Sequence, residues 1–496
     1  MKTADQIVDA CLSGGTISRQ NITGTVIRAY SISPYACYCE FHVDAKERDP
    51  FTRFGDLLRG WGLELEQKYV DSIDSTARKQ MFSYDRAGFE AFAAAALNGQ
   101  KCIYNPSLFY LNENLAGKPD LLERDDSAPS DFGEYHYRVT EIKLSSGFEE
   151  KKKRRYVLQG LFYNFLLGKI QGYFAPRFTM VDRHNARTSF DYAPLEHELI
   201  LALKEIENIQ LGIVKPDAVF GTCDDAYWSR YCNCQAEAEK DISIVPLLKD
   251  QRIRSQMLAR GIRIIDHVAK LSPDEISKFK WVGKRAELIA RHAGCLVTGK
   301  ESVVTPVVFP TVKDAEVYLD VEDTGDIHPR IPHFVFLIGA AVRKVGASPV
   351  SHSFVINSEK EIATKTSEFL TLLETLGDYR VYIWSKKEIV EFNKIFKTYG
   401  IANRSVDEFN SRCLDLKELF EGKVYFPVHG NSVKEIARYL GYNWREEGVD
   451  AMEGMALTYD YLEKGDQEAL KKVQTYNDDD CLAMITIKDW LAAHAS

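Results

Sequence analysis

The segment from Gly117 to Tyr163 restricts, more than any other, what this chain can fold into. It runs from Gly-Lys-Pro-Asp through an extended stretch, YHYRVTEIKL, to a helix that follows a basic run. In a strand, alternate side chains share a face, so Glu141 and Lys143 point the same way while Ile142 points into a sheet. Asp120 is expected at the end of a neighbouring strand or in a turn. The segment therefore predicts a mixed α/β fold that brings Asp120, Glu141 and Lys143 together.

These three residue types suit the hydrolysis of a phosphodiester. The reaction needs a hard cation, which takes carboxylate oxygens, and it needs a positioned water and stabilised phosphate charge. Gln159 and Tyr163 are four residues apart and share one face of the next helix, which we expect to begin near Glu149. The run KKKRR, which includes Lys152 and Arg155, suits a phosphate backbone. Because Glu-x-Lys and basic runs also occur on ordinary solvated faces, the order of the motifs carries the prediction.

The chain of 496 residues predicts about three domains. Residues 1–240 mix helix and strand, residues 241–300 form a short helical segment, and residues 312–496 return to an α/β pattern. The stretch GKESVVTPVVFPTVKD has two prolines and few helix formers, which is typical of a linker. The fold class is therefore α/β multidomain.

Charge and cysteine content bear on partners and compartment. The net charge of −9 does not indicate a strongly basic nucleic-acid binder, although charge is a local property. No basic region followed by an apolar run opens the sequence, and no run of about 18 apolar residues is present, so we expect a cytoplasmic protein without a membrane partner. In that compartment the ten cysteines are thiols or metal ligands rather than disulfides.

From about Ser33 to Cys234, the motifs resemble the RecB-like branch of the PD-(D/E)xK nucleases. GKPDLL is similar to the family's Asp motif, EIK to its Glu-x-Lys motif, and QGLFY to its Gln-x-x-x-Tyr motif. An earlier helical motif ends at Glu66, where Leu65 replaces the family's usual histidine. The resemblance implies a restriction-endonuclease-like α/β/α core. It also implies the following roles: Glu66, Asp120 and Glu141 would hold Mg²⁺ or Mn²⁺, Lys143 would orient the attacking water or the phosphate, and Gln159 and Tyr163 would line the DNA path.

Some RecB-like nucleases carry an iron–sulfur cluster, with one cysteine before the nuclease motifs and three after them. Cluster ligation requires four thiolates. The sequence offers Cys37 and Cys39 before the motifs, and Cys223, Cys232 and Cys234 after them. Ala226 stands where the family has a cysteine. A 4Fe-4S cluster, a zinc site and a set of buried free thiols all remain open.

The stretch WVGKRAELIARHA resembles the second half of a helix-hairpin-helix, a module that grips the DNA backbone. Gly283 would allow a close backbone approach, and the next helix would offer N–H groups to phosphate beside Lys284. Trp281 occupies the position of the family's first glycine. A plain helical linker is the alternative.

A second carboxylate pattern lies near the C-terminus. EVYLDVED places Asp320 and Glu322 on one face of a strand, and YNDDDC places Tyr476 and Asp480 one helical turn apart. This layout resembles the DEDD exonucleases, which have an RNase H-like fold and hold two metal ions at the scissile phosphate. The resemblance, over about Lys313 to Leu491, makes the acids metal ligands, and the tyrosine would orient the attacking water.

The same resemblance requires a middle acid, and Glu388 falls at its position, with Asp415 as another candidate for which we favour a structural role. The run Asp478 to Asp480 has a second interpretation, as an acidic cap at a helix end. A degenerate domain without catalysis is also open.

As a whole, the chain resembles RecB-like nucleases that carry a C-terminal RNase H-like domain. The resemblance implies a hydrolase that cuts DNA, as single strands or at duplex ends, with a 3′–5′ exonuclease site. The alternatives are a nucleic-acid-binding scaffold subunit whose sites have decayed, and a nuclease that acts on RNA. The sequence contains no helicase motif, so a motor would be a separate partner.

Overall fold

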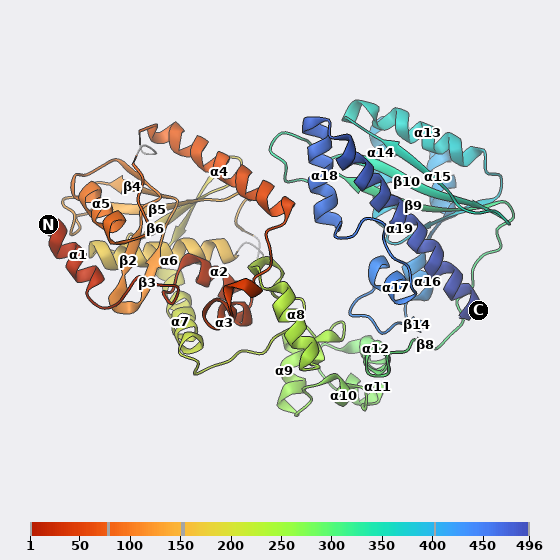
Figure 1. Cartoon of the computed structure of the whole chain (residues 1–496), viewed down its shortest axis with the longest axis horizontal. Helices are drawn as coiled ribbons and strands as arrows, with labels where there is room; N and C mark the ends of the chain where they lie inside the picture. Colours follow the sequence, from red (N-terminus) through yellow and green to blue (C-terminus); the bar gives the residue numbers. More distant parts are fainter. Residues whose placement is uncertain (1, 77–79, 150–153, 401–402, 495–496) are drawn as a thin grey trace. The chain divides into compact units, whose positions relative to one another are not determined.

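The computed structural model describes residues 2–76, 80–149, 154–400 and 403–494. The chain divides into two compact units, which are described separately (Figure 1). The first comprises residues 1–51 and 55–241, and the second comprises residues 52–54 and 242–496. No helix in the described ranges combines the length and apolar character that a bilayer crossing requires.

A mixed five-stranded sheet organises the described part of the first unit. Its strands, in spatial order, are β1 (Cys102–Tyr104), β4 (Leu121–Asp125), β5 (His136–Ile142), β6 (Arg177–Val181) and β7 (Arg187–Asp191). β5 and β6 are parallel, and the helix α6 (Arg154–Gln171) connects them. The other pairs are antiparallel. β2 (Leu108–Tyr110) and β3 (Leu115–Gly117) form a separate small pair.

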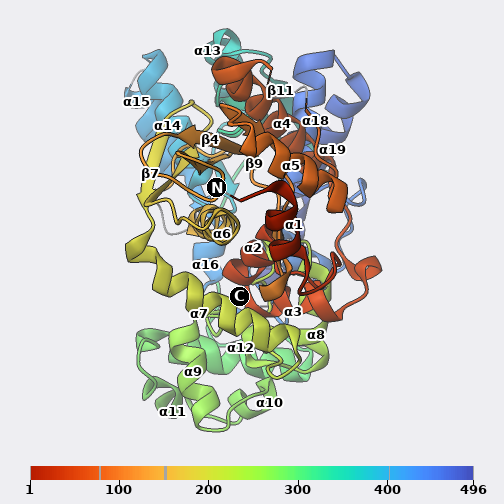
Figure 2. The ribbon, with the colours of Figure 1, turned by 90° about the vertical axis from the view of Figure 1, so that its left-hand side faces the viewer.

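Helices cover both faces of this sheet. On one face, Val70 of α4 (Arg53–Asp74) packs with Leu121 and Ile142. On the other, the almost wholly buried helix α6 packs with Val139 and Phe178. In Figure 2, α6 is seen nearly end-on, and α7 runs across beneath it. The layers are thus helix, sheet and helix. The further helices of the unit are α1 (Ala4–Leu12), α2 (Gly24–Ile32), α3 (Pro34–His42), α5 (Arg86–Leu97), α7 (Ala193–Gln210) and α8 (Ser229–Ala238).

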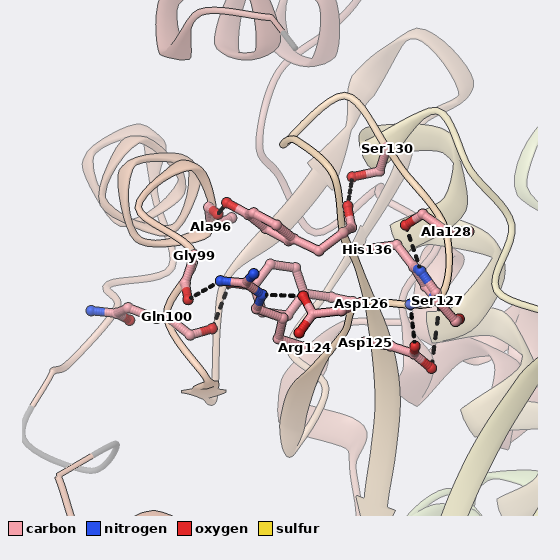
Figure 3. A network of polar contacts seen from close by, with 12 residues as sticks. Ala96, Gly99, Gln100, Arg124, Asp125, Asp126, Ser127, Ala128, Ser130 and His136 are labelled. Atoms are coloured by element: carbon pink, nitrogen blue, oxygen red, sulfur yellow. Dashed lines mark hydrogen bonds and ion pairs between the residues drawn. The ribbon is translucent and has the colours of Figure 1, made fainter.

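Polar contacts fix the turn between β4 and β5 (Figure 3). Arg124 donates to the carbonyl of Gly99 over 3.1 Å and to Asp126 over 2.7 Å. The Ser130 hydroxyl donates to the carbonyl of Tyr135 over 2.6 Å. At the other end of the two strands Leu121 pairs with Thr140, which places Asp120 beside Glu141.

We expected α6 to begin near Glu149. Glu149 itself is not helical, the described helix begins at Arg154, and residues 150–153 between them lie outside the described residues. The apolar stretch KCIYNPSLFYL forms two strands, β1 and β2, because Asn105 between them adopts a left-handed φ of 49°.

The second unit contains a five-stranded sheet with an antiparallel and a parallel half within its described residues. The order is β11 (Val350–Val355), β10 (Val335–Lys344), β9 (Ala315–Asp323), β12 (Tyr379–Ile383) and β13 (Cys413–Asp415). β11, β10 and β9 are antiparallel, whereas β12 and β13 run parallel to β9.

The long helix α19 (Gln467–His494) crosses one face of this sheet (Figure 1). Lys488 of α19 pairs with Glu316 of β9 over 2.7 Å, so the even-numbered residues of β9 face α19. Val317 and Leu319 point to the other face, where they belong to one buried cluster with the phenylalanines of α13, α14 and α15. The helices around the sheet are α13 (Ile362–Glu374), α14 (Lys387–Tyr399), α15 (Asn403–Arg412), α16 (Leu416–Phe420), α17 (Val433–Tyr439) and α18 (Ala451–Lys464).

The helical residues after 241 belong to the second unit. They form α9 (Gln251–Ala259), α10 (Ile265–Val268), α11 (Pro273–Ser277) and α12 (Ala286–Thr298). Ser272 and Glu275 make the expected capping box. α12 is tied to the rest of the unit because the His292 ring bonds the Val428 carbonyl, and the strand β8 (Ser302–Val303) pairs with β14 (Val424–Tyr425).

Candidate functional site

Three carboxylates converge where β9 meets α19. Asp320 and Glu322 lie on the α19 face of the strand, and Asp480 reaches them from the helix. One oxygen of each lies within 4.8 Å of the others, and among the described residues this is the one such set of three potential metal ligands. Strand alternation places Asp320 and Glu322 on one face, as their spacing predicts, and Asp480 joins them because α19 crosses that face.

Burial and mutual repulsion make this set costly in the absence of a cation. The pKa of Asp320 lies well above its usual range because of burial and then the charges of Glu322 and Asp480. Burial and the charge of Asp480 raise the pKa of Glu322 to about 8. Burial raises the pKa of Asp480 to about 6. Oxygen ligands that repel one another fit Mg²⁺ or Mn²⁺, because a hard divalent cation offsets their charge.

Neutral donors hold two of the carboxylates in place. Asn477 donates from Nδ2 to Oδ2 of Asp320 over 2.6 Å, and Trp444 donates from Nε1 to Oδ1 of Asp480 over 2.7 Å. Gly339 lies opposite Asp320 on β10, and a Cβ there would be 1.5 Å from Oδ1 of Asn477. The glycine therefore makes room for the amide that orients Asp320.

Tyr476 is 5% exposed and hydrogen-bonds Asp480, as their four-residue spacing predicts. Burial, followed by the charge of Asp480, raises its pKa. The ammonium of Lys434, on α17, lies 4.3 Å from the centre of the Tyr476 ring. The hydroxyl of Tyr476 is thus a protonated donor beside the acids at neutral pH.

Glu388, the expected middle acid, lies outside the set of three. It begins the buried side of α14 and is 4% exposed, and its Oε2 is buried without a hydrogen-bond partner in the described structure. Burial raises its pKa to about 7, and its charge raises the pKa of Asp320. Asp415 is the N-cap of α16, where it accepts from the Glu418 amide over 3.2 Å.

The interpretation of the acidic run as a helix-end cap is wrong. Residues 478–480 lie in the interior of α19, which begins at Gln467. Asp479 is fully buried and accepts from the Tyr442 hydroxyl over 2.8 Å and from the Arg445 amide over 2.8 Å. Asp478 pairs with Arg445. These two acids secure the loop that carries Trp444, which in turn contacts Asp480.

Residues 317–492 match the RNase H superfamily. The matched region begins in β9 and ends in α19, so it contains all three carboxylates of the set. This part of the chain is therefore called the RNase H-like domain below. A search of curated proteins finds no match to the chain.

In the first unit, Asp120, Glu141 and Lys143 also come together. Lys143 Nζ lies 3.0 Å from Oδ2 of Asp120 and 2.7 Å from Oε2 of Glu141. The amide of Asp120 donates to Oε1 of Glu141 over 2.9 Å, and the amide of Ile142 donates to Oδ2 of Asp120 over 2.7 Å. The two carboxylates therefore face each other with the lysine ammonium between them.

Electrostatics couple Glu66 to this group. Burial, followed by the charge of Asp120, raises the pKa of Glu66 to about 7, and Asn105 donates to its Oε1 over 2.9 Å. Burial and the charge of Asp120 raise the pKa of Glu141 to about 8. Burial alone would lower the pKa of Lys143, but the two adjacent carboxylates raise it. The expected ligands Glu66, Asp120 and Glu141 are thus near one another, although no described set within 4.8 Å includes them.

Gln159 and Tyr163 share a face of α6, and the amide of Gln159 contacts the Tyr163 hydroxyl over 3.4 Å. A Cβ at Gly24 or Gly117 would lie 2.2 Å or 2.6 Å from atoms of Tyr163, so both glycines accommodate this ring. Burial raises the pKa of Tyr163, and the charge of Glu141 raises it further. Tyr163 is therefore close to the acidic group.

The other residues that we expected to bind nucleic acid lie in different surroundings. Arg155 pairs with Asp225, so its guanidinium is already engaged by a carboxylate. Lys152 lies outside the described residues. Gly283 and Lys284 are exposed in the 3₁₀ turn Gly283–Arg285, directly before α12.

Four of the five candidate cluster cysteines are buried: Cys37, Cys39, Cys223 and Cys232. Cys234 is exposed. The thiols of Cys223 and Cys232 hydrogen-bond each other, which lowers the pKa of Cys223, and the charge of Cys223 contributes to the raised pKa of Cys39. The cluster stays a prediction.

Sequence reasoning missed Asn477, Trp444 and Gly339. An isolated glycine inside the apolar run FVFLIGAAV is a usable signal, because glycine in a strand often marks the close approach of another group. Trp444 has no such signal, since only the fold brings it to Asp480.

Proposed function

We propose that the RNase H-like domain is a metal-dependent nuclease that hydrolyses phosphodiester bonds. The observation that carries the proposal is the set of Asp320, Glu322 and Asp480, which are half-buried or buried and have oxygens within 4.8 Å of one another. A bound divalent cation would polarise the phosphate and activate a water. Tyr476 orients the water through its hydroxyl, while Asn477 holds Asp320 in the geometry that ligation needs.

The finer proposal is a DNA exonuclease that trims 3′ ends with Mg²⁺ or Mn²⁺. In this proposal the first unit is a second, RecB-like nuclease, in which Asp120, Glu141 and Glu66 would hold the metal. Lys143 would orient the attacking water or the phosphate. A separate helicase would supply unwound strands, because the sequence has no helicase motif.

The test is cleavage of end-labelled single-stranded and duplex DNA, with Mn²⁺ or Mg²⁺ and with a chelator. We expect Asp320→Asn to lower cleavage by more than about 100-fold, since the loss of even a supporting contact at a metal site costs about 10- to 100-fold. Glu368→Gln, an exposed acid of α13, is the control. Metal-dependent cleavage that Asp320→Asn leaves intact would refute the proposal.

Lys143→Ala, in the same assay, tests the first unit separately. If only Lys143→Ala lowers cleavage, the activity lies in the first unit and the proposal for the RNase H-like domain is wrong. Matched RNA oligonucleotides distinguish a ribonuclease from a deoxyribonuclease.

One observation favours a different role for the first unit. The Lys143 ammonium contacts both carboxylates within 3.0 Å, which is also the geometry of a structural ion triad. A first unit that binds nucleic acid as a scaffold, without cutting it, would bind DNA equally well in Lys143→Ala and contribute no cleavage.

A further inference from the structure

Trp281 differs from the other tryptophans of the chain. It is 61% exposed, whereas the remaining five are buried or half-buried. It lies between α11 and α12, in the second unit, beyond the residues that match the RNase H superfamily. A single exposed apolar residue is ordinary, so the case for a function depends on the backbone and the charges around this ring.

The backbone at Trp281 is strained in a way that keeps the ring exposed. Its φ is +74°, a conformation that favours glycine and is costly for a side chain of this size. The side chain of Gln256 holds the backbone of Lys280, the residue before Trp281. It accepts a hydrogen bond from the Lys280 amide over 3.0 Å and donates one to the Lys280 carbonyl over 3.3 Å. Arg285 donates to the carbonyls of Trp281 and Val282. The surrounding contacts therefore impose the unusual conformation.

Positive charge surrounds the ring. Residues 249–285 contain ten lysines and arginines against four aspartates and glutamates, whereas the whole chain has 63 against 72. The guanidinium of Arg252, which pairs with Asp250 over 2.6 Å, lies 5.0 Å from the centre of the Trp281 ring. Lys280 and Lys284 are exposed on either side of Trp281 in the sequence. At Gly283, also in the left-handed region, a Cβ would meet nothing within 4 Å, so the backbone there is open to approach.

We propose that Trp281 is a stacking platform for an unpaired base of a single-stranded nucleic acid, with Lys280 and Lys284 binding the adjacent phosphates. An exposed aromatic ring inside a cationic patch is the combination that binds single strands, because bases stack on the ring while the backbone meets the charge. In a duplex the bases are paired and stacked on one another, so the ring adds nothing. Charge complementarity favours this ligand over an apolar protein partner.

The inference rests on the proposed nuclease function for the class of substrate, and the binding assay separates the two. Binding is measured by fluorescence anisotropy in a chelator, with a labelled oligodeoxythymidylate, the matched oligoribonucleotide and a duplex. We expect Trp281→Ala to weaken single-strand binding by about 5- to 140-fold, the range for one stacked base, and to change duplex binding little. Trp281→Phe keeps an aromatic ring, so its affinity for the single strand should fall less than that of Trp281→Ala.

Trp281→Gly guards against misfolding, because glycine suits a φ of +74° and should fold at least as well as the wild type while binding single strands weakly. Tyr399→Ala removes another exposed ring of the same unit and should bind like the wild type. Unchanged single-strand binding in both Trp281→Ala and Trp281→Gly, or an equal loss for single strands and duplex, would overturn the proposal. A binding-competent protein that does not cut would refute only the nuclease function.

Discussion

Asn477 of α19 donates a hydrogen bond to Asp320 of β9 over 2.6 Å, although 157 positions separate them in the sequence. Burial and the charge of Asp480 raise the pKa of Glu322, and a hydrogen bond with the Asn477 side chain partly opposes this rise, so Asn477 acts on both strand carboxylates of the set. Since Asn477 is only 1% exposed, its side chain is held by the packing of α19 on β10. The long helix therefore contributes a candidate metal ligand, Asp480, and the amide that orients the candidate ligand on the strand, Asp320.

Asn477→Ala removes this donor and leaves the carboxylates in place. We expect the metal concentration for half-maximal cleavage to rise by about 10- to 100-fold, because supporting hydrogen bonds tune a metal site to that extent. Cleavage is measured as a function of Mn²⁺ and Mg²⁺ concentration. Gln474→Ala, three residues earlier on α19, serves as the control. If the metal concentration for half-maximal cleavage is unchanged in Asn477→Ala, Asn477 does not position Asp320 for metal binding.

Gly339→Ala introduces a Cβ that would lie 1.5 Å from Oδ1 of Asn477. We expect a loss of about 1–3 kcal/mol in the free energy of unfolding, as for other overpacked cores, together with the metal defect of Asn477→Ala. Urea unfolding measures the first effect. Gly294→Ala, on α12 with nothing within 4 Å of its Cβ, should be neutral or slightly stabilising. In the double variant Gly339→Ala/Asn477→Ala the two losses should not add, because the clashing amide is gone; full additivity would contradict the packing argument.

Lys143→Met leaves Asp120 and the fully buried Glu141 facing each other without the ammonium. We expect a loss of about 3–5 kcal/mol in metal-free buffer, because removing one partner of a buried pair leaves an uncompensated charge. Mn²⁺ should then raise the melting temperature of Lys143→Met more than that of the wild type. A thermal melt with and without metal tests both effects. Equal melting of the two proteins without metal would show that the ion triad does not stabilise the unit.

The predictable parts of the site are those that depend on local periodicity. Alternation places Asp320 beside Glu322, and helical spacing places Tyr476 beside Asp480, so each pair follows from the sequence alone. Their meeting depends on how α19 crosses β9, which no local pattern encodes. For the same reason the sequence does not predict the contact of Trp444 with Asp480, since Trp444 lies in a loop 36 positions away.

The unpredicted strands share a physical cause. β7 and β11 are edge strands whose side chains are exposed or half-buried, so they lack the apolar alternation by which a strand is detected. The central strand β9, in contrast, is largely buried and rich in apolar residues, and the sequence predicts it. Sequence patterns therefore locate the core of each sheet better than its margins.

Glu316→Gln tests the ion cluster that joins β9 to α19. Glu316 binds Lys488 over 2.7 Å and the Arg343 Nε over 3.0 Å, and the Tyr318 hydroxyl donates to it over 2.8 Å. Burial alone would raise the pKa of Glu316, but the hydrogen bonds from Lys488, Arg343 and Tyr318 hold it below the ordinary 4.5. We expect the variant to lose about 2–3 kcal/mol at pH 7, since hydrogen bonds to a charged group are lost while two cations remain.

The sign of the pH dependence follows from the lowered pKa of Glu316. The unfolded chain binds the proton more readily than the folded one, so the stabilisation is fully present above about pH 4.5 and declines as the pH falls through the folded pKa. The difference between wild type and Glu316→Gln should therefore shrink below pH 4.5. Urea unfolding from pH 7 to pH 3 measures it, with Glu368→Gln, which breaks an exposed pair with Lys365, as a control worth less than about 1 kcal/mol. A difference that stays constant over this range would mean that the Glu316 charge does not stabilise the contact between β9 and α19.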